Sequence, residues 1–469
     1  MGIRIKIFIL FFITLYIIKT ATVPTATGKN TITQSTTISE GTYASTNADE
    51  NVFLVSSGAT LTLSGSVTIN KSGDASNTEN AEFYGINAAI LVQNSSSASI
   101  SGVTINSSGK GANSVFAYGA NSKITIAEST ITSTGSSSAR GLLATYTGKI
   151  EASQVTISTT GGSCAALATD RGEGEVSCNQ CTLSTSGAGS PVIYSTGTIT
   201  ITNSTTGTAT GSQMVVVEGK NSAIIKDSTL SANGKGNRND IDSCGIFIYQ
   251  SMSGDADSGT ASFTTTNSSF TITNETATIP MFFVTNTQAT ITINANNVFV
   301  FPSGIFLDVS ATDSSVGWGS SGSNGGDLTI TLNGQAIEGD ITVDELSSMN
   351  LYLKNGASLK GKINANKKGC VVTVSIDSTS KWELTGNSYA NITSNEGTLT
   401  NNGYSVTQID SCETNNNVGG QGDGNAPPDG NMPNGNSGNN DSNNGDDSDS
   451  SAYLVKKLSL MITLISFIL

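Results

Sequence analysis

One pattern recurs every 26 residues between Ala98 and Gly187, and it constrains the fold more than any other feature of the sequence. Each of its four copies ends on an aliphatic anchor residue, and a glycine follows each anchor four positions later. The anchors are Ile105, Ile131, Ile157 and Leu183, and the glycines are Gly109, Gly135, Gly161 and Gly187. A fixed period of this length is typical of a solenoid, in which equivalent residues of successive coils stack.

Apolar residues within each copy recur at every second position, as at 98 and 100 and again at 103 and 105. That spacing is typical of a β-strand with one buried face, and no helical spacing accompanies it. A unit of this length cannot bury its inner face alone and must stack on copies of itself. The sequence therefore predicts an all-β, single-stranded parallel β-helix over residues 30–410, with the four anchors pointing inward. Its coils would hold about 21–26 residues and lie about 4.8 Å apart.

Two stretches interrupt this regularity and are expected to bulge from the coils. The first includes residues 74–83, and the second is residues 235–243. Short apolar runs, such as Val115–Tyr118, precede the anchor strands and predict a second strand in each coil.

Composition excludes some classes of partner. Only 12% of the residues are charged, and the net charge is −14, so nucleic acid is not expected to bind. The acidity could attract calcium, but we expect it mainly to aid solubility, and we predict no cofactor. Ser, Thr and Asn are abundant enough for a disordered chain, yet the strict alternation argues for an ordered body, which we expect to be monomeric.

Both ends of the chain differ from the body. Residues 1–22 resemble a secretory signal, with Arg4 and Lys6 before an apolar run. Residues 413–451 are rich in Asn, Gly, Asp and Ser and predict a flexible stalk. Residues 452–469 form an apolar tail, which predicts a GPI-attachment signal or, alternatively, a membrane anchor. These features predict an extracellular protein that is held at the cell surface through its C-terminal tail.

An exported eukaryotic protein would also carry N-linked glycans at some of its Asn-x-Ser/Thr sequons. Many sequons arise by chance in a chain so rich in these residues. The candidates are Asn70, Asn94, Asn106, Asn203, Asn267, Asn274, Asn391 and Asn440.

The pair Cys178 and Cys181 has the spacing of a metal or redox pair. Both cysteines fall in columns that are apolar in the other copies, so we expect them to pack in the core as small apolar side chains. A disulfide between them is the alternative. Zinc would need more ligands, and the chain has no histidine. Export also permits a bridge between Cys370 and Cys412 that would secure the last coils.

Acidic clusters are potential catalytic sites, because glycosidases need two facing carboxylates. The candidates are Asp170 with Arg171, Glu173 and Glu175, then Asp240 with Asp242, and Asp255 with Asp257. Arg171 is the one conspicuous basic candidate for a lyase. Asp255 and Asp257 lie in a Gly- and Ser-rich loop, and we expect them to have no basic partner. We therefore expect solvated loops, with no catalytic residue and no metal site.

Six stretches of the body are more specific than its richness in Ser and Thr. They are Phe83–Ile90, Ala168–Gly172, Ser190–Ser195, Val217–Asn221, Tyr249–Asp255 and Trp318–Gly326. Through these stretches the body resembles the right-handed β-helix, adhesin-like surface proteins common among gut anaerobic bacteria, over roughly residues 40–405. The GPI-like tail differs from bacterial anchors. The resemblance implies a right-handed helix and a surface protein without established catalytic residues.

These observations predict an adhesin-like protein that attaches to glycans or to a host or neighbouring cell surface. Many weak contacts along a long polar face would suit multivalent binding. The alternative is a polysaccharide-active enzyme or a carbohydrate-binding protein that acts on plant cell-wall polymers. A third hypothesis is a structural coat protein.

Overall fold

A computed structural model describes residues 23–238, 240–312, 316 and 318–409. The predicted signal, stalk and C-terminal tail, together with Cys412 and Asn440, lie outside the described residues.

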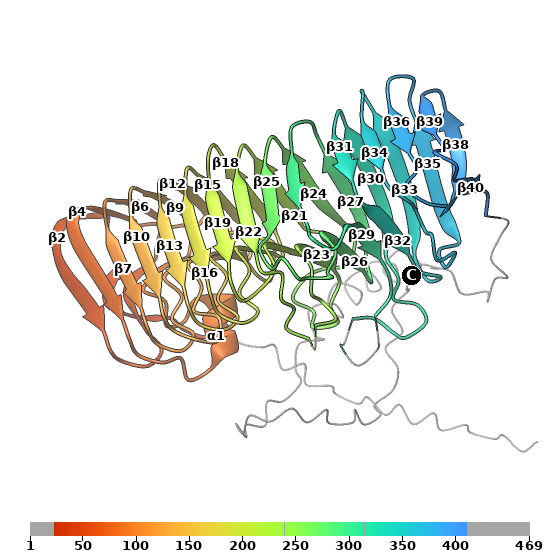
Figure 1. Ribbon diagram of the computed structural model, residues 1–469. Coiled ribbons are helices and arrows are strands. Elements are labelled where there is room, and N and C mark those ends of the chain that lie inside the picture. Colours follow the sequence, from red (N-terminus) through yellow and green to blue (C-terminus); the bar gives the residue numbers. More distant parts are fainter. Residues whose placement is uncertain (1–22, 239, 313–315, 317, 410–469) are drawn as a thin grey trace, which may run out of the picture. The chain divides into compact units, whose positions relative to one another are not determined.

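The predicted fold class is confirmed: the protein is a parallel β-helix (Figure 1). Of the residues that the structure describes, 49% are in strands and 2% are in a helix, and the strands pair in parallel. A regular coil contributes three strands to three ladders, because the chain changes direction after each strand, as it does after β8, β9 and β10.

The first ladder is a sheet of twelve strands. They are β1 (Thr27–Ile32), β3 (Glu50–Val55), β5 (Ile90–Val92), β8 (Val115–Tyr118), β11 (Leu142–Thr145), β14 (Leu167–Thr169), β17 (Ile193–Ser195), β20 (Val215–Glu218), β23 (Ile246–Tyr249), β26 (Phe282–Thr285), β29 (Ile305–Val309) and β32 (Asp340–Val343).

The second and third ladders form one sheet of 22 strands, because β2 (Thr36–Ser45) and β4 (Thr60–Lys71) run through both. The second ladder holds β6 (Ser97–Ser101), β9 (Lys123–Ala127), β12 (Lys149–Ser153), β15 (Glu175–Asn179), β18 (Thr198–Thr202), β21 (Ser222–Lys226), β24 (Thr260–Thr266), β27 (Gln288–Ile293), β30 (Asp327–Asn333), β33 (Ser348–Lys354), β35 (Val371–Ile376) and β38 (Asn391–Asn395). The third holds β7 (Thr104–Ser107), β10 (Thr130–Ser133), β13 (Thr156–Thr159), β16 (Thr182–Thr185), β19 (Thr206–Ala209), β22 (Thr229–Ala232), β25 (Ser269–Ile272) and β28 (Val298–Val300).

The last coils carry two small sheets. One contains β31 (Ala336–Glu338), β34 (Ser358–Lys360), β36 (Lys381–Glu383) and β39 (Thr398–Thr400), and the other contains β37 (Ser388–Tyr389) and β40 (Val406–Thr407).

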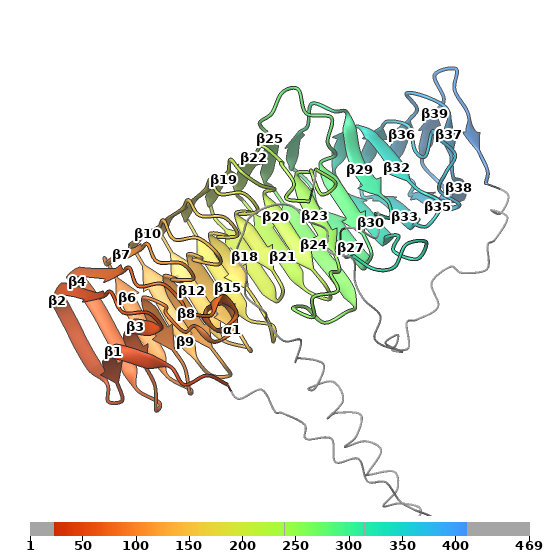
Figure 2. The same cartoon turned by 90° about the horizontal axis from the view of Figure 1, so that it is seen from below.

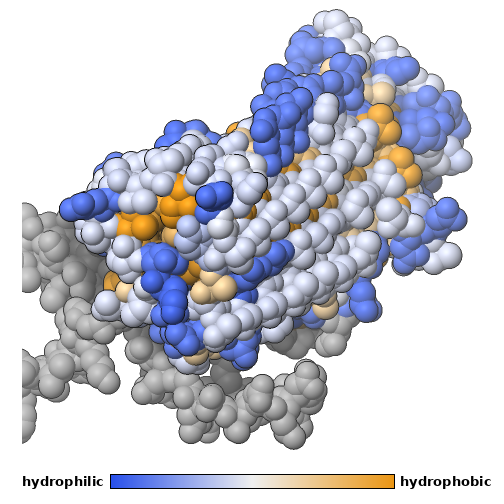
Figure 3. All heavy atoms as spheres, turned by 90° about the vertical axis from the view of Figure 1, so that its left-hand side faces the viewer, coloured by the Kyte–Doolittle hydropathy of each residue, from blue (hydrophilic) through white to orange (hydrophobic). Residues whose placement is uncertain are grey.

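The four anchor residues stack inside the helix. Ile131 pairs in register with Ile105 and Ile157, and Ile157 pairs with Leu183. Each of the four is at most 2% exposed. Outward residues of the second ladder are mostly Ser and Thr, such as Thr125 and Thr200, and Figure 3 shows pale rows of mildly polar residues on the surface of the helix.

The repeated glycines are required by the close approach of successive coils. A Cβ atom on Gly161 would lie 1.8 Å from the carbonyl oxygen of Gly135, and one on Gly187 would lie 1.8 Å from that of Gly161. Carbon and oxygen cannot approach so closely. The glycine four positions after each anchor therefore lets the chain turn directly above the coil before it.

The expectation that Cys178 and Cys181 pack as separate thiols is wrong, because they form a disulfide. Their burial was predicted correctly, since each is 1% exposed within the core. The chain bends between them at Gln180, whose φ is +55°. That bend leaves the two Cα atoms 6.0 Å apart with both side chains directed inward, which is within the range that a disulfide spans. The pairing of Cys370 with Cys412 stays a prediction, because Cys412 is outside the described residues.

The first ladder is covered on its outer face as well as its inner face. Its strands β3, β5, β8 and β11 are buried at almost every residue, unlike the alternating strands of the other ladders. The insertion of residues 74–83 contributes to this cover, and it contains most of the one helix of the described residues, α1 (Thr78–Tyr84). Helix α1 lies over the first ladder (Figure 2), where Thr145 donates a hydrogen bond to the carbonyl oxygen of Phe83.

Candidate functional site

The outer face of the first ladder carries a row of large side chains in the middle of the helix. Tyr194, Val216 and Phe247 pair in register on β17, β20 and β23. Two residues further along their strands, Glu218 and Tyr249 form the next outward column. Alternate residues of a strand point to the same face, so both columns face the covering segments.

A cavity of about 300 Å³ lies over these columns. Five successive coils contribute to its lining. From each coil in turn, one lining residue is Arg140, Ala165, Tyr194, Val216 and Phe247. The covering segments close it: Glu82 comes from α1, Asp242 from the insertion of residues 235–243, and Trp318 from the loop after β29. The cavity is therefore made jointly by the coils and by the segments that interrupt their period.

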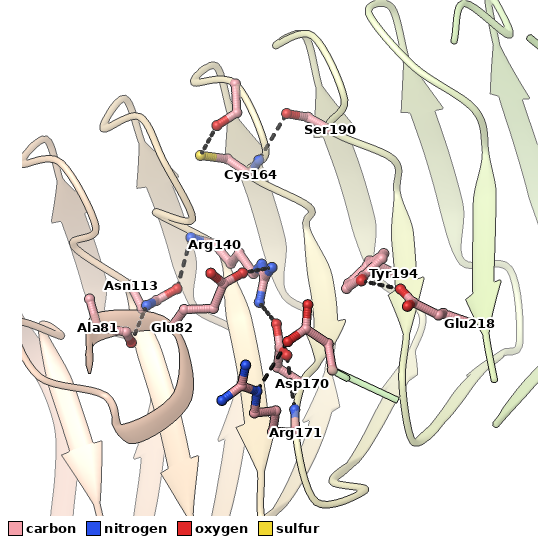
Figure 4. A network of polar contacts seen from close by, with 12 residues as sticks. Ala81, Glu82, Asn113, Arg140, Cys164, Asp170, Arg171, Ser190, Tyr194 and Glu218 are labelled. Carbon is pink, nitrogen blue, oxygen red and sulfur yellow. Dashed lines mark hydrogen bonds and ion pairs between the residues drawn. The ribbon is translucent and has the colours of Figure 1, made fainter. Parts of the chain in front are cut away.

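A buried arginine, Arg140, lines one end of the cavity. Figure 4 shows it between Glu82 and Asp170. Nη1 of Arg140 donates to Oδ2 of Asp170 at 2.5 Å, and Nη2 donates to Oε1 of Glu82. The Arg140 guanidinium also lies 5.4 Å from the centre of the Tyr194 ring. Since Glu82 belongs to α1, this arginine attaches the helix to the coils.

Burial and charge shift the pKa values of Asp170 and Arg140. Burial raises the pKa of Asp170 to about 8, and the Arg140 guanidinium offsets only part of that rise. Burial alone would lower the pKa of Arg140, but Glu82 and Asp170 raise it above its usual value. The arginine therefore stays charged between two acidic groups.

A second buried carboxylate organises the tyrosines. Glu218 is 1% exposed and accepts hydrogen bonds from the hydroxyl groups of Tyr194, at 2.6 Å, and Tyr249, at 2.8 Å. Ser251 donates to its other oxygen. Burial raises the pKa of both phenols well above the usual value, so they remain protonated donors to Glu218. This fixes the direction of both aromatic rings.

Aromatic rings form the opposite end of the cavity. The ring centres of Phe247 and Tyr249 lie 4.4 Å apart in a stacked pair. Trp318 packs against both, with its ring centre 5.1 Å from that of Phe247 and 5.2 Å from that of Tyr249. The cavity thus combines an aromatic wall with hydrogen-bonding side chains such as Gln213.

The expectation of solvated acidic loops is wrong for several of the predicted residues. Asp170 and Asp242 are 2% and 5% exposed. Asp242 accepts hydrogen bonds from the backbone N–H groups of Asn237 and Arg238, at 3.0 and 2.9 Å, which fixes the insertion over the cavity. Only Asp242 of the predicted acidic residues lines the cavity.

The expectation that Asp255 and Asp257 have no basic partner is also wrong. Nε of Arg171 donates to Oδ1 of Asp255 at 3.0 Å, and Lys220 pairs with Asp257 at 3.2 Å. These partners are 84 and 37 residues away in the sequence, so no local pattern could reveal them. The remaining predicted carboxylates lie in surface contacts: Glu173 pairs with Lys220, Glu175 pairs with Lys149, and Asp240 accepts from the Ser243 hydroxyl group.

Sequence reasoning missed Glu82, Arg140, Tyr194 and Tyr249. One signal was present, because the chain has only four arginines and two of them, Arg140 and Arg238, line the cavity. A third arginine, Arg171, follows Asp170 directly, and its backbone N–H donates a hydrogen bond to the Asp170 carboxylate.

The seven sequon asparagines that the structure describes lie elsewhere. Asn70 and Asn106 are on the third ladder, Asn203 and Asn267 are at bends of the coil, and Asn391 is on β38. The other two are Asn94, at a bend after β5, and Asn274, in the loop after β25. Among residues 23–409, without the gaps noted above, no group of three metal-ligating side chains is arranged to hold calcium or another metal. No helix in that part of the chain is long and apolar enough to span a bilayer.

The fold and the cavity define a class of protein: a parallel β-helix whose outer face carries an axial cavity under non-repetitive insertions. No family model matches the chain, and no curated protein sequence is significantly similar to it. The chemistry of the cavity is therefore the main guide to function.

Proposed function

We propose that this protein binds glycans in the cavity of the first ladder and thereby mediates attachment at a cell surface. The observation that carries the proposal is the combination of an aromatic wall, formed by Phe247, Tyr249 and Trp318, with buried and oriented polar groups. Binding cavities are commonly lined by aromatic side chains with a few polar groups that fix the ligand's orientation.

Sugars match both parts of this lining. One face of a pyranose ring exposes C–H groups that pack on an aromatic ring, and its hydroxyl groups both donate and accept hydrogen bonds. Gln213 and Ser163 can donate or accept, and the Glu82 carboxylate can accept a charge-assisted hydrogen bond. Because Glu218 holds the hydroxyl groups of Tyr194 and Tyr249, their rings are preorganised for stacking.

The same geometry favours binding over catalysis. The two carboxylates in the lining are both engaged, Glu82 with Arg140 and Asp242 with the backbone N–H groups of its own loop. Asp170, whose raised pKa would suit a proton donor, is 2% exposed and does not line the cavity. A glycoside hydrolase needs two carboxyl groups that reach the bond between two sugars.

Attachment requires display outside the cell, which the predicted signal at residues 1–22 and the apolar tail at residues 452–469 would provide. The stalk at residues 413–451 would hold the β-helix away from the membrane. Many tethered copies, each with one cavity, would bind a glycan-coated surface with an avidity that exceeds the affinity of a single site.

The test is to apply the full-length protein to an array of neutral, acidic, linear and branched glycans. We expect retention of at least one glycan, with affinity reduced about tenfold or more by Tyr249→Ala, because tyrosine and tryptophan dominate binding energies at such sites. Tyr352→Ala removes a tyrosine from the outer face of β33 and should leave affinity unchanged. Failure of every glycan class to bind a correctly folded protein would refute the proposal.

A further inference from the structure

We infer that the ligand of this cavity is a neutral, unbranched oligosaccharide chain that lies along the axis of the β-helix. This inference rests on the glycan binding proposed above. It adds the class of glycan and the direction in which the chain lies, and it comes from the length, the charge and the two unlike ends of the cavity.

The cavity is long and narrow. Its lining runs from Arg140 on the coil of β11 to Phe247 on the coil of β23, which are four coils apart. With about 4.8 Å between coils, this separation is about 19 Å along the axis. A volume of about 300 Å³ spread over five coils leaves little width. One unbranched chain with a few sugar units in the cavity suits this shape better than a branched glycan.

The charges of the lining favour a neutral chain. Arg140 is already paired with Glu82 and Asp170, so its positive charge is compensated within the protein. The other charged residues of the lining, Asp242 and Arg238, have opposite signs. Because the whole protein carries a net charge of −14, it would repel a polyanionic chain on approach.

The two ends of the cavity offer different chemistry. At the β23 end, the lining is aromatic, and Tyr249 is its most exposed ring because Phe247 and Trp318 are only 2% and 4% exposed. At the α1 end, Glu82 and Arg140 provide charged hydrogen-bonding groups but no stacking pair. A short oligosaccharide would occupy the aromatic end, and only a longer one would also reach Glu82.

The experiment measures affinity by calorimetry for cello-, xylo-, manno- and chito-oligosaccharides, each from the disaccharide to the octasaccharide, with oligogalacturonides as the acidic comparison. We expect at least one neutral series to gain about tenfold in affinity as its length increases and then to reach a plateau. Affinity independent of length, binding of the oligogalacturonides alone, or binding of none of the neutral series would overturn the inference.

Variants at the α1 end provide the second readout. Glu82→Gln should remove most of the gain shown by long oligosaccharides and should lower the affinity for the shortest ones much less. The matched control is Glu79→Gln, on the exposed side of the same helix. It should change neither the affinity for short oligosaccharides nor the affinity for long ones. Equal loss for short and long ligands in Glu82→Gln would contradict the axial placement. Retention of only branched or acidic glycans on the array would reject this inference and leave the proposed function standing.

Discussion

Nη1 of Arg140 lies 2.5 Å from Oδ2 of Asp170, and both side chains are almost completely buried on the outer face of the first ladder. The pair joins the coil of β11 to the end of β14, and Glu82 extends it to α1. A covering segment that no repeat specifies is thus held in place by a charge interaction inside the protein.

Removing the arginine should be strongly destabilising. Arg140→Met removes the buried cation that Glu82 and Asp170 share, and losing one partner of such a buried interaction costs about 3–5 kcal/mol. Lys220→Met removes a cation from an exposed pairing with Glu173 and should cost less than about 1 kcal/mol. Urea unfolding followed by circular dichroism compares the two variants, and similar midpoints would contradict the buried role of Arg140.

Stability should depend on pH through Asp170. Its folded pKa of about 8 exceeds its ordinary value of 3.8, so between these values the folded protein binds more protons than the unfolded chain. Its contribution is therefore fully present below about pH 4 and is lost as the pH rises to about 8, with a slope of up to about 1.4 kcal/mol per pH unit. Asp170→Asn should flatten the curve of unfolding free energy against pH, whereas the exposed Asp257→Asn should not. If the slope of the unfolding free energy against pH is unchanged in Asp170→Asn, the titration of Asp170 is not its cause.

Adjacent glycines should differ in their tolerance of alanine. Gly161→Ala would place a Cβ atom 1.8 Å from the carbonyl oxygen of Gly135, so the coils must move apart, at a cost of about 1–3 kcal/mol or more. At Gly162 the nearest atom to such a Cβ is 3.5 Å away, which is an ordinary contact. Thermal unfolding should show a lower midpoint for Gly161→Ala alone. A similar midpoint in both variants would show that the coils have room to adjust.

Two sequon asparagines should not carry glycans on the same chain. Asn70 and Asn106 pair in register on β4 and β7, and Nδ2 of Asn106 donates to Oδ1 of Asn70 at 2.9 Å. Neighbouring strands are about 4.8 Å apart, which is too close for two branched glycans. After expression through a eukaryotic secretory pathway, mass spectrometry should find either site occupied but never both together. Asn70 and the exposed Asn274 are the comparison pair, and both of them can be glycosylated on one chain. Chains glycosylated at both Asn70 and Asn106 would contradict the register of β4 and β7.

The inward columns could be predicted because they depend on local, repeated information. Ile105 and Ile131 alternate with polar residues and recur at the period of one coil, so both the strand and its buried face follow from the sequence. Strands such as β8 and β11 are buried along their whole length, and in the sequence they are short apolar runs. Such runs are typical of strands that are covered on both faces. By themselves the runs predict a second strand in each coil, and they do not identify the segments that cover its outer face.

The disulfide between Cys178 and Cys181 was predicted only in part. The columns of the repeat correctly placed Cys178 and Cys181 in the core, but whether two inward side chains meet depends on the bend at Gln180. The sequence defines which face of a strand a residue occupies. It does not define the distance between two residues on either side of a bend.

The sequence by itself determined the stacked coils, their inward aliphatic columns and the places where the period is interrupted. Only the tertiary structure decided that those interruptions fold back over the first ladder and enclose a cavity. The physical reason is that Arg140 meets Glu82 across 58 residues and Arg171 meets Asp255 across 84. Such contacts depend on charge and shape complementarity between segments that share no repeat, so no periodic pattern encodes them.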